Sequence, residues 1–311
     1  MISRSFEEAD LERLVVETRP LGADGKVATY IPELAGGNPC VLAIAAMDAG
    51  GSLVSGGDRD VRFTMQSISK IVSLSLALLE LGEEKVFSKV GMDPTADPFN
   101  SVMRLEMIRP HVPQNPLINA GAIVIDSLLP YTDPENAFRA VRDMARRMAG
   151  NPEIRENKAV YLSEKRTGDR NRSLAYFLKS VGTIETDVET VLDVYFRQCS
   201  LEVTVSDLAV LAATIAMDGK NPKTGEEVLP AKICRTVRAL MATCGLYDGS
   251  GAFAVRVGLP AKSGVGGGIV AAIPKSMGIA VCGPALDRQG NSIAGIALLE
   301  RLSDRFGLRV L

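Results

Sequence analysis

The segment from Ile68 to Leu81 is predicted to form a helix that is apolar on every side. Apolar residues stand at positions 71, 72, 74, 76, 77, 78, 79 and 81, so no face of this helix is left for water. A helix with this pattern lies in the interior of a protein. The rest of the chain must therefore surround it, and the residues at its first turn lie at the mouth of a buried region.

A serine and a lysine stand at that first turn. Ser67 and Lys70 form an S-x-x-K pattern, which places a hydroxyl and an amine one helical turn apart on one face. Helical side chains lean toward the N-terminus, so we expect Lys70 to reach back to Ser67 rather than forward to Ser73. The positive end of the helix dipole favours an oxyanion there and disfavours a protonated lysine. The pattern predicts a nucleophile beside a base, although alone it is more often a capped helix start.

Composition narrows the chemistry that could take place at this turn. The chain has 311 residues and a net charge of -2, which gives no reason to expect nucleic acid or an anionic membrane as a partner. Five scattered cysteines contain no C-x-x-C pair, so neither a disulfide framework nor a zinc site is expected. His111 is the only histidine, and it lies in a proline-rich stretch. A base for a hydroxyl nucleophile should therefore be lysine or tyrosine.

The chain shows no sign of a membrane or export segment. No apolar run reaches the roughly 20 residues that a membrane-spanning helix needs. The N-terminal residues are polar and acidic, unlike a secretory signal. We therefore expect a cytoplasmic protein.

Strand-like patterns occur near both ends of the chain, with helical patterns between them. The expected strands are 41–47, 52–54 and 61–65, as an antiparallel meander, and 269–273 and 278–282, as a hairpin. Residues 231–245 and 292–306 read as later helices. We expect an α+β fold in which an antiparallel sheet flanked by helices is built from residues 1–66 and 222–311, and 67–221 forms an inserted helical subdomain.

Capping residues mark several helix ends. The first helix is expected to begin at a capping box in 5–8 and to stop near Pro20. Asp133 and Thr204 are typical N-caps, and Asp133 is followed by proline at the first helical position. Glycines 150, 182 and 219 mark helix ends.

A second short motif occurs far downstream of the serine. Lys262, Ser263 and Gly264 form a K-[ST]-G triplet that leads into the predicted strand 269–273. This order after S-x-x-K is found in the serine acyl-transferases that include class A β-lactamases and penicillin-binding proteins. The physical reason is that an edge strand can lay a backbone N–H beside the serine and complete an oxyanion hole.

Longer motifs make a more specific resemblance, which runs from Tyr30 almost to the C-terminus. They are Gln66-Ser67 with Lys70, Asn115 to Ala122, Ser163-Glu164 with Gly168 to Asn171, Tyr195-Phe196 with Cys199-Ser200, Cys244 to Asp248, and Gly258 to Gly268. By these motifs the chain resembles the serine-dependent glutaminase family. The resemblance implies a β-lactamase/transpeptidase-like fold and hydrolysis of L-glutamine to L-glutamate and ammonia.

The same resemblance implies roles for individual residues. Ser67 would be the nucleophile, Lys70 its activating partner and Tyr247 the phenol that helps pass the proton, with the backbone N–H of Val265 in the oxyanion hole. The implied substrate pocket consists of Tyr30, Ser67, Asn119, Glu164, Asn171, Tyr195, Tyr247 and Val265. Neither a metal nor an organic cofactor is implied, and relatives suggest a homodimer or homotetramer.

The chemistry of these residues suits glutamine. A selective site must satisfy an α-ammonium, an α-carboxylate and a side-chain amide. Glu164 can pair with the ammonium group, and the amides of Asn119 and Asn171 and the phenol of Tyr195 can hydrogen-bond the other two groups.

Two other functions are open at this point. A penicillin-recognising hydrolase of the same fold would share S-x-x-K and K-[ST]-G, but the chain has no S-D-N triplet between them. A catalytically silent amino-acid-binding protein or a self-assembling structural protein would need none of the reactive groups. The presence of Ser67, Lys70 and Tyr247 argues against it.

Overall fold

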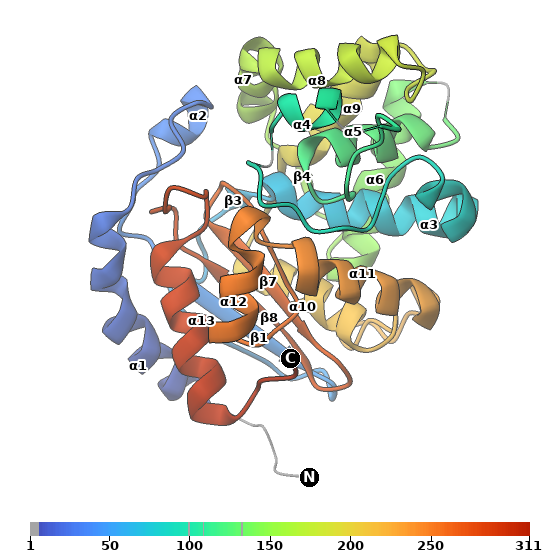
Figure 1. The fold of residues 1–311 in the computed structure, drawn as a ribbon. Coiled ribbons are helices and arrows are strands. Elements are labelled where there is room, and N and C mark those ends of the chain that lie inside the picture. Colours follow the sequence, from blue (N-terminus) through green and yellow to red (C-terminus); the bar gives the residue numbers. More distant parts are fainter. Residues whose placement is uncertain (1–5, 99, 108, 132) are drawn as a thin grey trace.

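The computed structural model describes residues 6–311 except 99, 108 and 132. A five-stranded antiparallel sheet lies at the centre of one half of the molecule, in the order β2-β1-β8-β7-β6 (Figure 1). Its strands are β1 (Ala43–Asp48), β2 (Leu53–Gly57), β6 (Ala261–Ser263), β7 (Gly268–Ile273) and β8 (Met277–Cys282). β1 pairs with β8, for example Ala45 with Ala280, so the two ends of the chain join in one sheet. The expected hairpin and the α+β class are confirmed.

Helices cover both faces of this sheet because alternate strand residues point to opposite sides. On one face, Ile44, Ile269 and Val281 pack against the helices near the two ends of the chain. Those helices are α1 (Glu8–Thr18), α12 (Ser250–Arg256) and α13 (Ile293–Phe306). On the other face lies α10 (Val205–Ala216). α10 comes so close to β8 that a Cβ atom on Gly278 would lie 2.0 Å from the backbone nitrogen of Ala213.

The third strand of the expected meander belongs to a different sheet, so that part of the prediction is wrong. β3 (Phe63–Thr64) pairs with β5 (Leu201–Val203), and β5 pairs with β4 (Arg155–Glu156). β2 stays the edge strand of the five-stranded sheet, and β3 does not add to it. After β2 the chain continues to the start of the buried helix, where the N–H of Met65 donates to the carbonyl of Leu201 at 2.8 Å.

The other half of the molecule is mainly helical (Figure 1). Its α-helices are α3 (Ser69–Phe87), α4 (Met103–Met107), α5 (Asn119–Leu128), α6 (Pro134–Ala149), α7 (Lys158–Thr167), α8 (Asp169–Ser180) and α9 (Val188–Cys199). The remaining helical elements are α2 (Pro32–Ala35), α11 (Ala231–Cys244) and the 3-10 turns η1 (Arg19–Asp24), η2 (Gln66–Ile68) and η3 (Tyr247–Gly249).

The helix expected to be buried on all sides is buried. Every residue of α3 from Ser69 to Leu78 is buried, as the all-round apolar pattern predicts. The helix continues beyond the expected end at Leu81 and runs to Phe87, with a break at Gly82, where φ is 78°.

Capping residues largely act as expected. Asp133 accepts a hydrogen bond from the N–H of Glu135, and Thr204 forms a capping box at the start of α10. Gly150 ends α6 in the left-handed conformation. At the first helix, Glu7 is the N-cap, while the expected box residue Ser5 lies outside the described residues.

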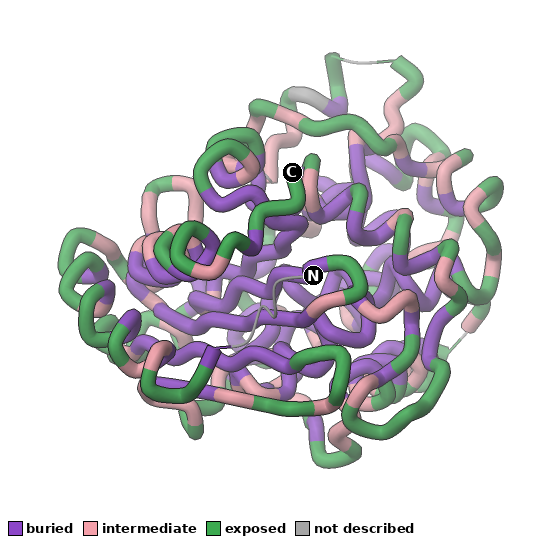
Figure 2. The backbone as a smooth tube through the Cα atoms, turned by 90° about the horizontal axis from the view of Figure 1, so that it is seen from below, coloured by how far each residue is buried: buried purple, intermediate pink, exposed green. Residues whose placement is uncertain are grey.

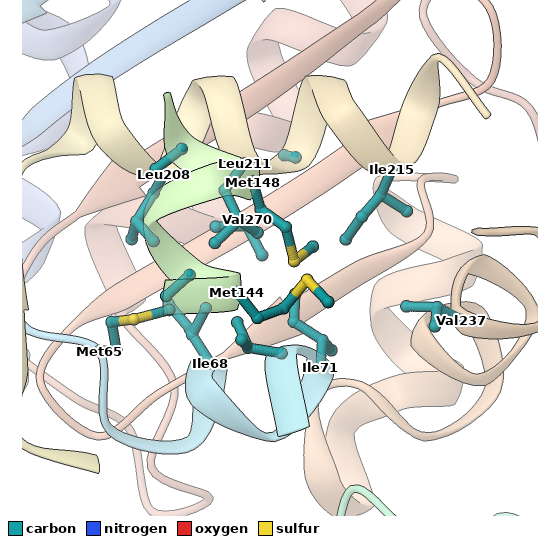
Figure 3. Close-up of a cluster of buried hydrophobic side chains, with 14 of the residues drawn as sticks. Met65, Ile68, Ile71, Met144, Met148, Leu208, Leu211, Ile215, Val237 and Val270 are labelled. Carbon is teal, nitrogen blue, oxygen red and sulfur yellow. The ribbon is translucent and has the colours of Figure 1, made fainter. Parts of the chain in front are cut away.

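A large apolar cluster lies between α3 and the sheet (Figure 3). Ile68 and Ile71 point from the start of α3 toward Met144 and Met148 of α6 and toward side chains of α10 and β7. The strands run through the buried interior, with exposed residues at the periphery (Figure 2). The division of the chain at residues 66 and 221 stays a prediction. α10 falls on the helical side of that division but packs on the sheet.

Within the described residues, no helix has both the length and the hydropathy needed to cross a membrane. All five cysteines have free thiols, and only Cys40 is exposed.

Candidate active site

The turn between β3 and α3 holds Ser67 in a strained backbone. Gln66, directly before the serine, has a φ of 47°, in the left-handed region that non-glycine residues seldom adopt. Such backbone strain costs about 1–3 kcal/mol and is characteristic of functional sites. Ser67 itself is only 6% exposed and lies in η2, at the amino end of α3. The local fold therefore fixes this hydroxyl where the helix dipole favours negative charge.

The end of edge strand β6 lies directly against this turn. A Cβ atom on Gly264 would lie 2.6 Å from the carbonyl oxygen of Met65 and 3.3 Å from the nitrogen of Ser67. On Gly266 it would lie 2.7 Å from the carbonyl oxygen of Thr64. Only glycines fit this close approach. They bring the loop that carries Val265 beside the serine.

Lys70 is buried, and its amine points to the start of α5. Its Nζ donates to Oδ1 of Asn119 at 2.6 Å and to the carbonyl of Leu117 at 3.5 Å. Among the described residues it makes no hydrogen bond to the Ser67 hydroxyl, in contrast to the expected contact. Burial lowers the pKa of Lys70 to about 8, against the opposing effect of nearby acidic groups. About a tenth of this amine is therefore neutral at pH 7.

Tyr247 comes from the opposite side of the site and lies near the serine. Its backbone is also left-handed, with a φ of 58°. Its hydroxyl donates to the carbonyl of Ser263 at 3.4 Å and lies near Ser67, whose side chain affects its pKa. Burial raises the pKa of Tyr247 to about 12, and the nearby Ser67 side chain opposes that rise. The phenol is thus protonated and close to Ser67.

Lys262 lies beneath Tyr247, and the sequence indicated it only as part of the K-[ST]-G triplet. Its side chain is fully buried and its Nζ donates to the carbonyls of Gly245 and Ser263, at 3.0 and 2.5 Å. The same atom lies 4.4 Å from the centre of the Tyr247 ring. Burial, and next the charge of Lys70, hold the pKa of Lys262 well below its usual value.

Three of the expected pocket residues lie near the Lys70 amine: Asn119 contacts it, Asn171 contacts Asn119, and Tyr195 lies beside it. Asn119, which accepts from Lys70, donates through Nδ2 to Oδ1 of Asn171 at 2.9 Å. The ring centre of Tyr195 lies 6.0 Å from the same amine. Burial raises the pKa of Tyr195 well above its usual value, so this phenol is neutral. α5, α8 and α9 supply these side chains, which no local pattern in the sequence relates to one another.

Glu164 on α7 is buried and lacks a partner for one carboxylate oxygen. Its Oε1 has no hydrogen bond among the described residues. Burial raises the pKa of Glu164 to about 7, while Gln66 and Lys70 oppose the rise. Gln66, another residue that the sequence did not single out for binding, therefore lies near this carboxylate, and its Nε2 donates to Oγ1 of Thr64 at 3.1 Å. An unpaired buried acceptor is suited to a cationic ligand group.

Tyr30 lies at the mouth of the site. The residue is 57% exposed and lines a cavity of 480 Å³ together with Val265 and Arg288. Its pKa is raised well above the usual value by burial of its hydroxyl and by Tyr247 and Glu164. The ring therefore spans from solvent to the interior of the site.

The only histidine takes no part in this arrangement. His111 Nδ1 lies 2.7 Å from the carbonyl of Leu105, and its ring packs edge-on against Phe177. Lysine and tyrosine therefore stay the predicted bases.

Known proteins resemble this chain over nearly its whole length. The glutaminase family model matches residues 25–311. A glutaminase of Clostridium tetani is 50% identical over 303 residues, 97% of this chain and 99% of that protein. One of Clostridium botulinum (strain Loch Maree) is 50% identical over 300 residues, 96% of this chain and 98% of that protein.

Solved structures give the same result. A Bacillus glutaminase crystallised in 4.3 M NaCl superposes with a TM-score of 0.91 at 38% identity, covering 98% of this chain and 99% of that one. A probable glutaminase of Bacillus subtilis complexed with 6-diazo-5-oxo-L-norleucine has a TM-score of 0.89 at 36% identity, covering 98% and 96%.

Proposed function

This chain belongs to the glutaminase family and hydrolyses L-glutamine to L-glutamate and ammonia, and we propose that it does so through a γ-glutamyl ester on Ser67. The observation that carries the proposal is the position of Ser67, buried in η2 at the amino end of α3, beside Tyr247 and three residues before the buried Lys70. A hydroxyl needs a neighbouring base to become a nucleophile at neutral pH. Lys70 is the group whose pKa suits that task.

Formation of the ester begins with removal of the serine proton. Neutral Lys70 accepts this proton, directly or through Tyr247, as Ser67 Oγ bonds to the side-chain amide carbon of glutamine. The amide oxygen becomes an oxyanion that the backbone N–H groups of Ser67 and Val265 stabilise. The proton then passes to the amide nitrogen, the C–N bond breaks and ammonia leaves.

Hydrolysis of the ester repeats these steps with water. A water molecule gives a proton to the same relay and attacks the ester carbon. The C–O bond to Ser67 breaks, and the relay returns the proton to the serine oxygen. L-Glutamate is released and Lys70 is neutral again, so protons and bonds balance over one turnover.

The residues around the Lys70 amine, and Tyr30 at the mouth of the site, are proposed to bind the substrate. The unpaired Oε1 of Glu164 supports pairing with the α-ammonium group. The amides of Asn119 and Asn171 and the hydroxyls of Tyr30 and Tyr195 are proposed to hydrogen-bond the α-carboxylate and the amide. The bacterial relative that binds 6-diazo-5-oxo-L-norleucine supports this view, since that compound retains the amino and carboxylate groups of glutamine.

The direct test is replacement of Ser67 by Ala, with ammonia release measured on glutamine and on asparagine. Turnover should be lost in a protein that unfolds at the same temperature as the parent. The matched control is Ser75→Ala, because Ser75 is buried on α3 and its hydroxyl bonds, within the described part of the chain, only to the carbonyl of Ile71. Near-normal ammonia release from the Ser67 variant would contradict the mechanism.

Assembly and location are proposed as well. Met103 and Met107, 68% and 75% exposed on one side of α4, support a homodimer or homotetramer, because large apolar side chains on the surface often mark contacts between chains. Five free thiols support a cytoplasmic location. Light scattering of the purified protein tests the first proposal, and cell fractionation tests the second.

A further inference from the structure

The stretch that leads into α5 contains a buried asparagine that the mechanism proposed above does not use. Asn115 is 0% exposed. Its side chain closes a turn, because Oδ1 accepts from the N–H of Leu117 at 3.0 Å and from the N–H of Ile118 at 3.2 Å. Asparagine often closes turns in this way. We call residues 115–119 the Asn115 turn.

The Asn115 turn is tied to the chain segment that follows α3. Nδ2 of Asn115 donates to the carbonyl of Asp93 at 2.8 Å. In the same region the backbone N–H groups of Gly91 and Asp93 donate to the carbonyls of Pro113 and Gln114, at 2.8 and 2.9 Å. The turn is therefore held on one side by its own side-chain bonds and on the other by a neighbouring segment.

The first turn of α5 packs directly on the Asn115 turn. A Cβ atom on Gly121 would lie 1.9 Å from the carbonyl oxygen of Asn115. Only glycine permits this approach. Asn119 is the first residue of α5, so this contact also sets the position of Asn119.

The hydrogen bond from Ile118 sets the direction of the Leu117 carbonyl. The N–H of Ile118 and the C=O of Leu117 belong to one trans peptide group, which is planar and directs these two groups to opposite sides. Because the N–H points to Oδ1 of Asn115, the C=O points away from Asn115. On that side it accepts from Nζ of Lys70 at 3.5 Å.

Two acceptors of the Asn115 turn therefore face the Lys70 amine. Its Nζ donates to Oδ1 of Asn119 at 2.6 Å as well as to the carbonyl of Leu117. A neutral amine has two N–H groups and one lone pair about a tetrahedral nitrogen. When both N–H groups are directed to the start of α5, the lone pair points away from α5. In the proposed mechanism this lone pair accepts the Ser67 proton.

We propose that Asn115 is a positioning residue for this reaction. By closing its turn it holds the Leu117 carbonyl and Asn119 where they orient the lone pair of neutral Lys70. The inference rests on the proposed function of Lys70. Asn115 acts through these two acceptors, and the substrate and the reacting atoms are contacted by other residues.

The test compares Asn115→Ala with Asn221→Ala. Asn221 is the matched control, because it is also 0% exposed and closes the same kind of turn far from the site. Its Oδ1 accepts from the N–H groups of Lys223 and Thr224 at 2.9 and 3.2 Å, and its Nδ2 donates to two carbonyls at the end of α6. Both variants lose equivalent hydrogen bonds, so both should unfold at a lower temperature than the parent.

Only Asn115→Ala should lose activity. A catalytic group displaced by about 1 Å can cost about 10²-fold in rate, so kcat should fall by about that factor. Asn221→Ala should keep the kcat of the parent. Equal kcat values for the two variants, measured well below their unfolding temperatures, would overturn the proposal.

A second pair of variants keeps the test decisive if Asn115→Ala does not fold. Asn115→Ser and Asn221→Ser place a hydroxyl oxygen near the turn, and serine closes such turns more weakly than asparagine. The Asn115 variant should then lose about tenfold in kcat, and the Asn221 variant should lose nothing. Equal kcat values would again contradict the positioning role.

A readout without turnover separates this inference from the proposed function. The NMR signal of Lys70 is followed in Ser67→Ala protein with 13C-labelled lysine and is identified by its loss in Ser67→Ala/Lys70→Arg. It should shift when Asn115→Ala is added and stay in place when Asn221→Ala is added. An unshifted signal would refute the positioning role even if Ser67 is the nucleophile, whereas turnover by Ser67→Ala would refute the mechanism and leave the orientation of the amine intact.

Discussion

Replacing Glu164 by Gln should change both substrate binding and the steepness with which the rate depends on pH. In the proposed mechanism Glu164 must be ionised to hold the substrate ammonium group, and Lys70 must be neutral to accept a proton. The pKa values of these groups are about 7 and about 8. Both conditions are met more fully as the pH rises, so their effects multiply on the acid side of the profile.

The size of the effect follows from these two values. At pH 6 about 9% of Glu164 is ionised and about 1% of Lys70 is neutral, whereas at pH 8 the fractions are about 91% and 50%. The parent enzyme should therefore gain about 500-fold in kcat/KM between pH 6 and pH 8. The Glu164→Gln variant keeps only the dependence on Lys70, which gives about 50-fold. Loss of the Glu164 charge also lowers the Lys70 pKa and reduces that gain further.

The assay is initial-rate glutamate formation from glutamine between pH 6 and pH 9, with kcat and KM determined at each pH. The variant should have a higher KM at pH 8 and a shallower acid limb. Glu153→Gln is the control, because Glu153 is exposed and its side chain forms no hydrogen bond or ion pair among the described residues. A Glu164→Gln variant with the parent's slope, or with an unchanged KM, would refute the assigned role of the carboxylate.

Two other changes have defined consequences. Gly264→Ala should lower kcat by about 10²–10³-fold, because its Cβ atom would press on Met65 and displace the loop that carries an oxyanion donor. Gly251→Ala, whose Cβ atom would meet nothing within 4 Å, should leave kcat unchanged, and equal effects of the two would contradict this reading. Glu164→Gln should also stabilise the fold. Burial raises the pKa of the Glu164 carboxyl group from 4.5 to about 7, so the free energy of unfolding is highest below pH 4.5, where the group is protonated, and falls as the pH rises through 7. Glutamine cannot ionise and avoids that loss. The gain, measured by urea unfolding, should be about 3 kcal/mol at pH 8.5 and under about 1 kcal/mol at pH 5, and a gain independent of pH would exclude this cause.

The parts of the fold that could be predicted from sequence are those set by local pattern. The all-round apolar run identified α3 as buried, and Asp133, Thr204 and Gly150 marked helix ends because capping depends on a few adjacent residues. The partner of β3 could not be predicted in this way. Residues 201–203 are too short a run to stand out within a helical block, and their pairing with β3 joins residues far apart in the chain.

The part of the candidate site that could be predicted from sequence consists of residues that belong to recognisable motifs. Ser67, Lys70 and the K-[ST]-G triplet follow from short spacings, and the resemblance to glutaminases supplied the rest. The hydrogen bond of Lys70 to Asn119 did not follow, because it depends on how α5 packs against α3.

The comparisons also choose among the functions that the sequence left open. The relatives described above are glutaminases over nearly their full length, and none is a penicillin-recognising hydrolase. A chromogenic β-lactam assay offers an independent check.

Val265 connects the entrance of the site with the proposed oxyanion hole. Its backbone lies in the loop held beside Ser67, whereas its side chain packs in a small apolar cluster with Ala28, Ile31 and Leu286, next to Tyr30 at the mouth. The side chain and the backbone N–H of this residue therefore cannot be altered independently. A substitution that changes the packing at the entrance should also shift the proposed oxyanion donor.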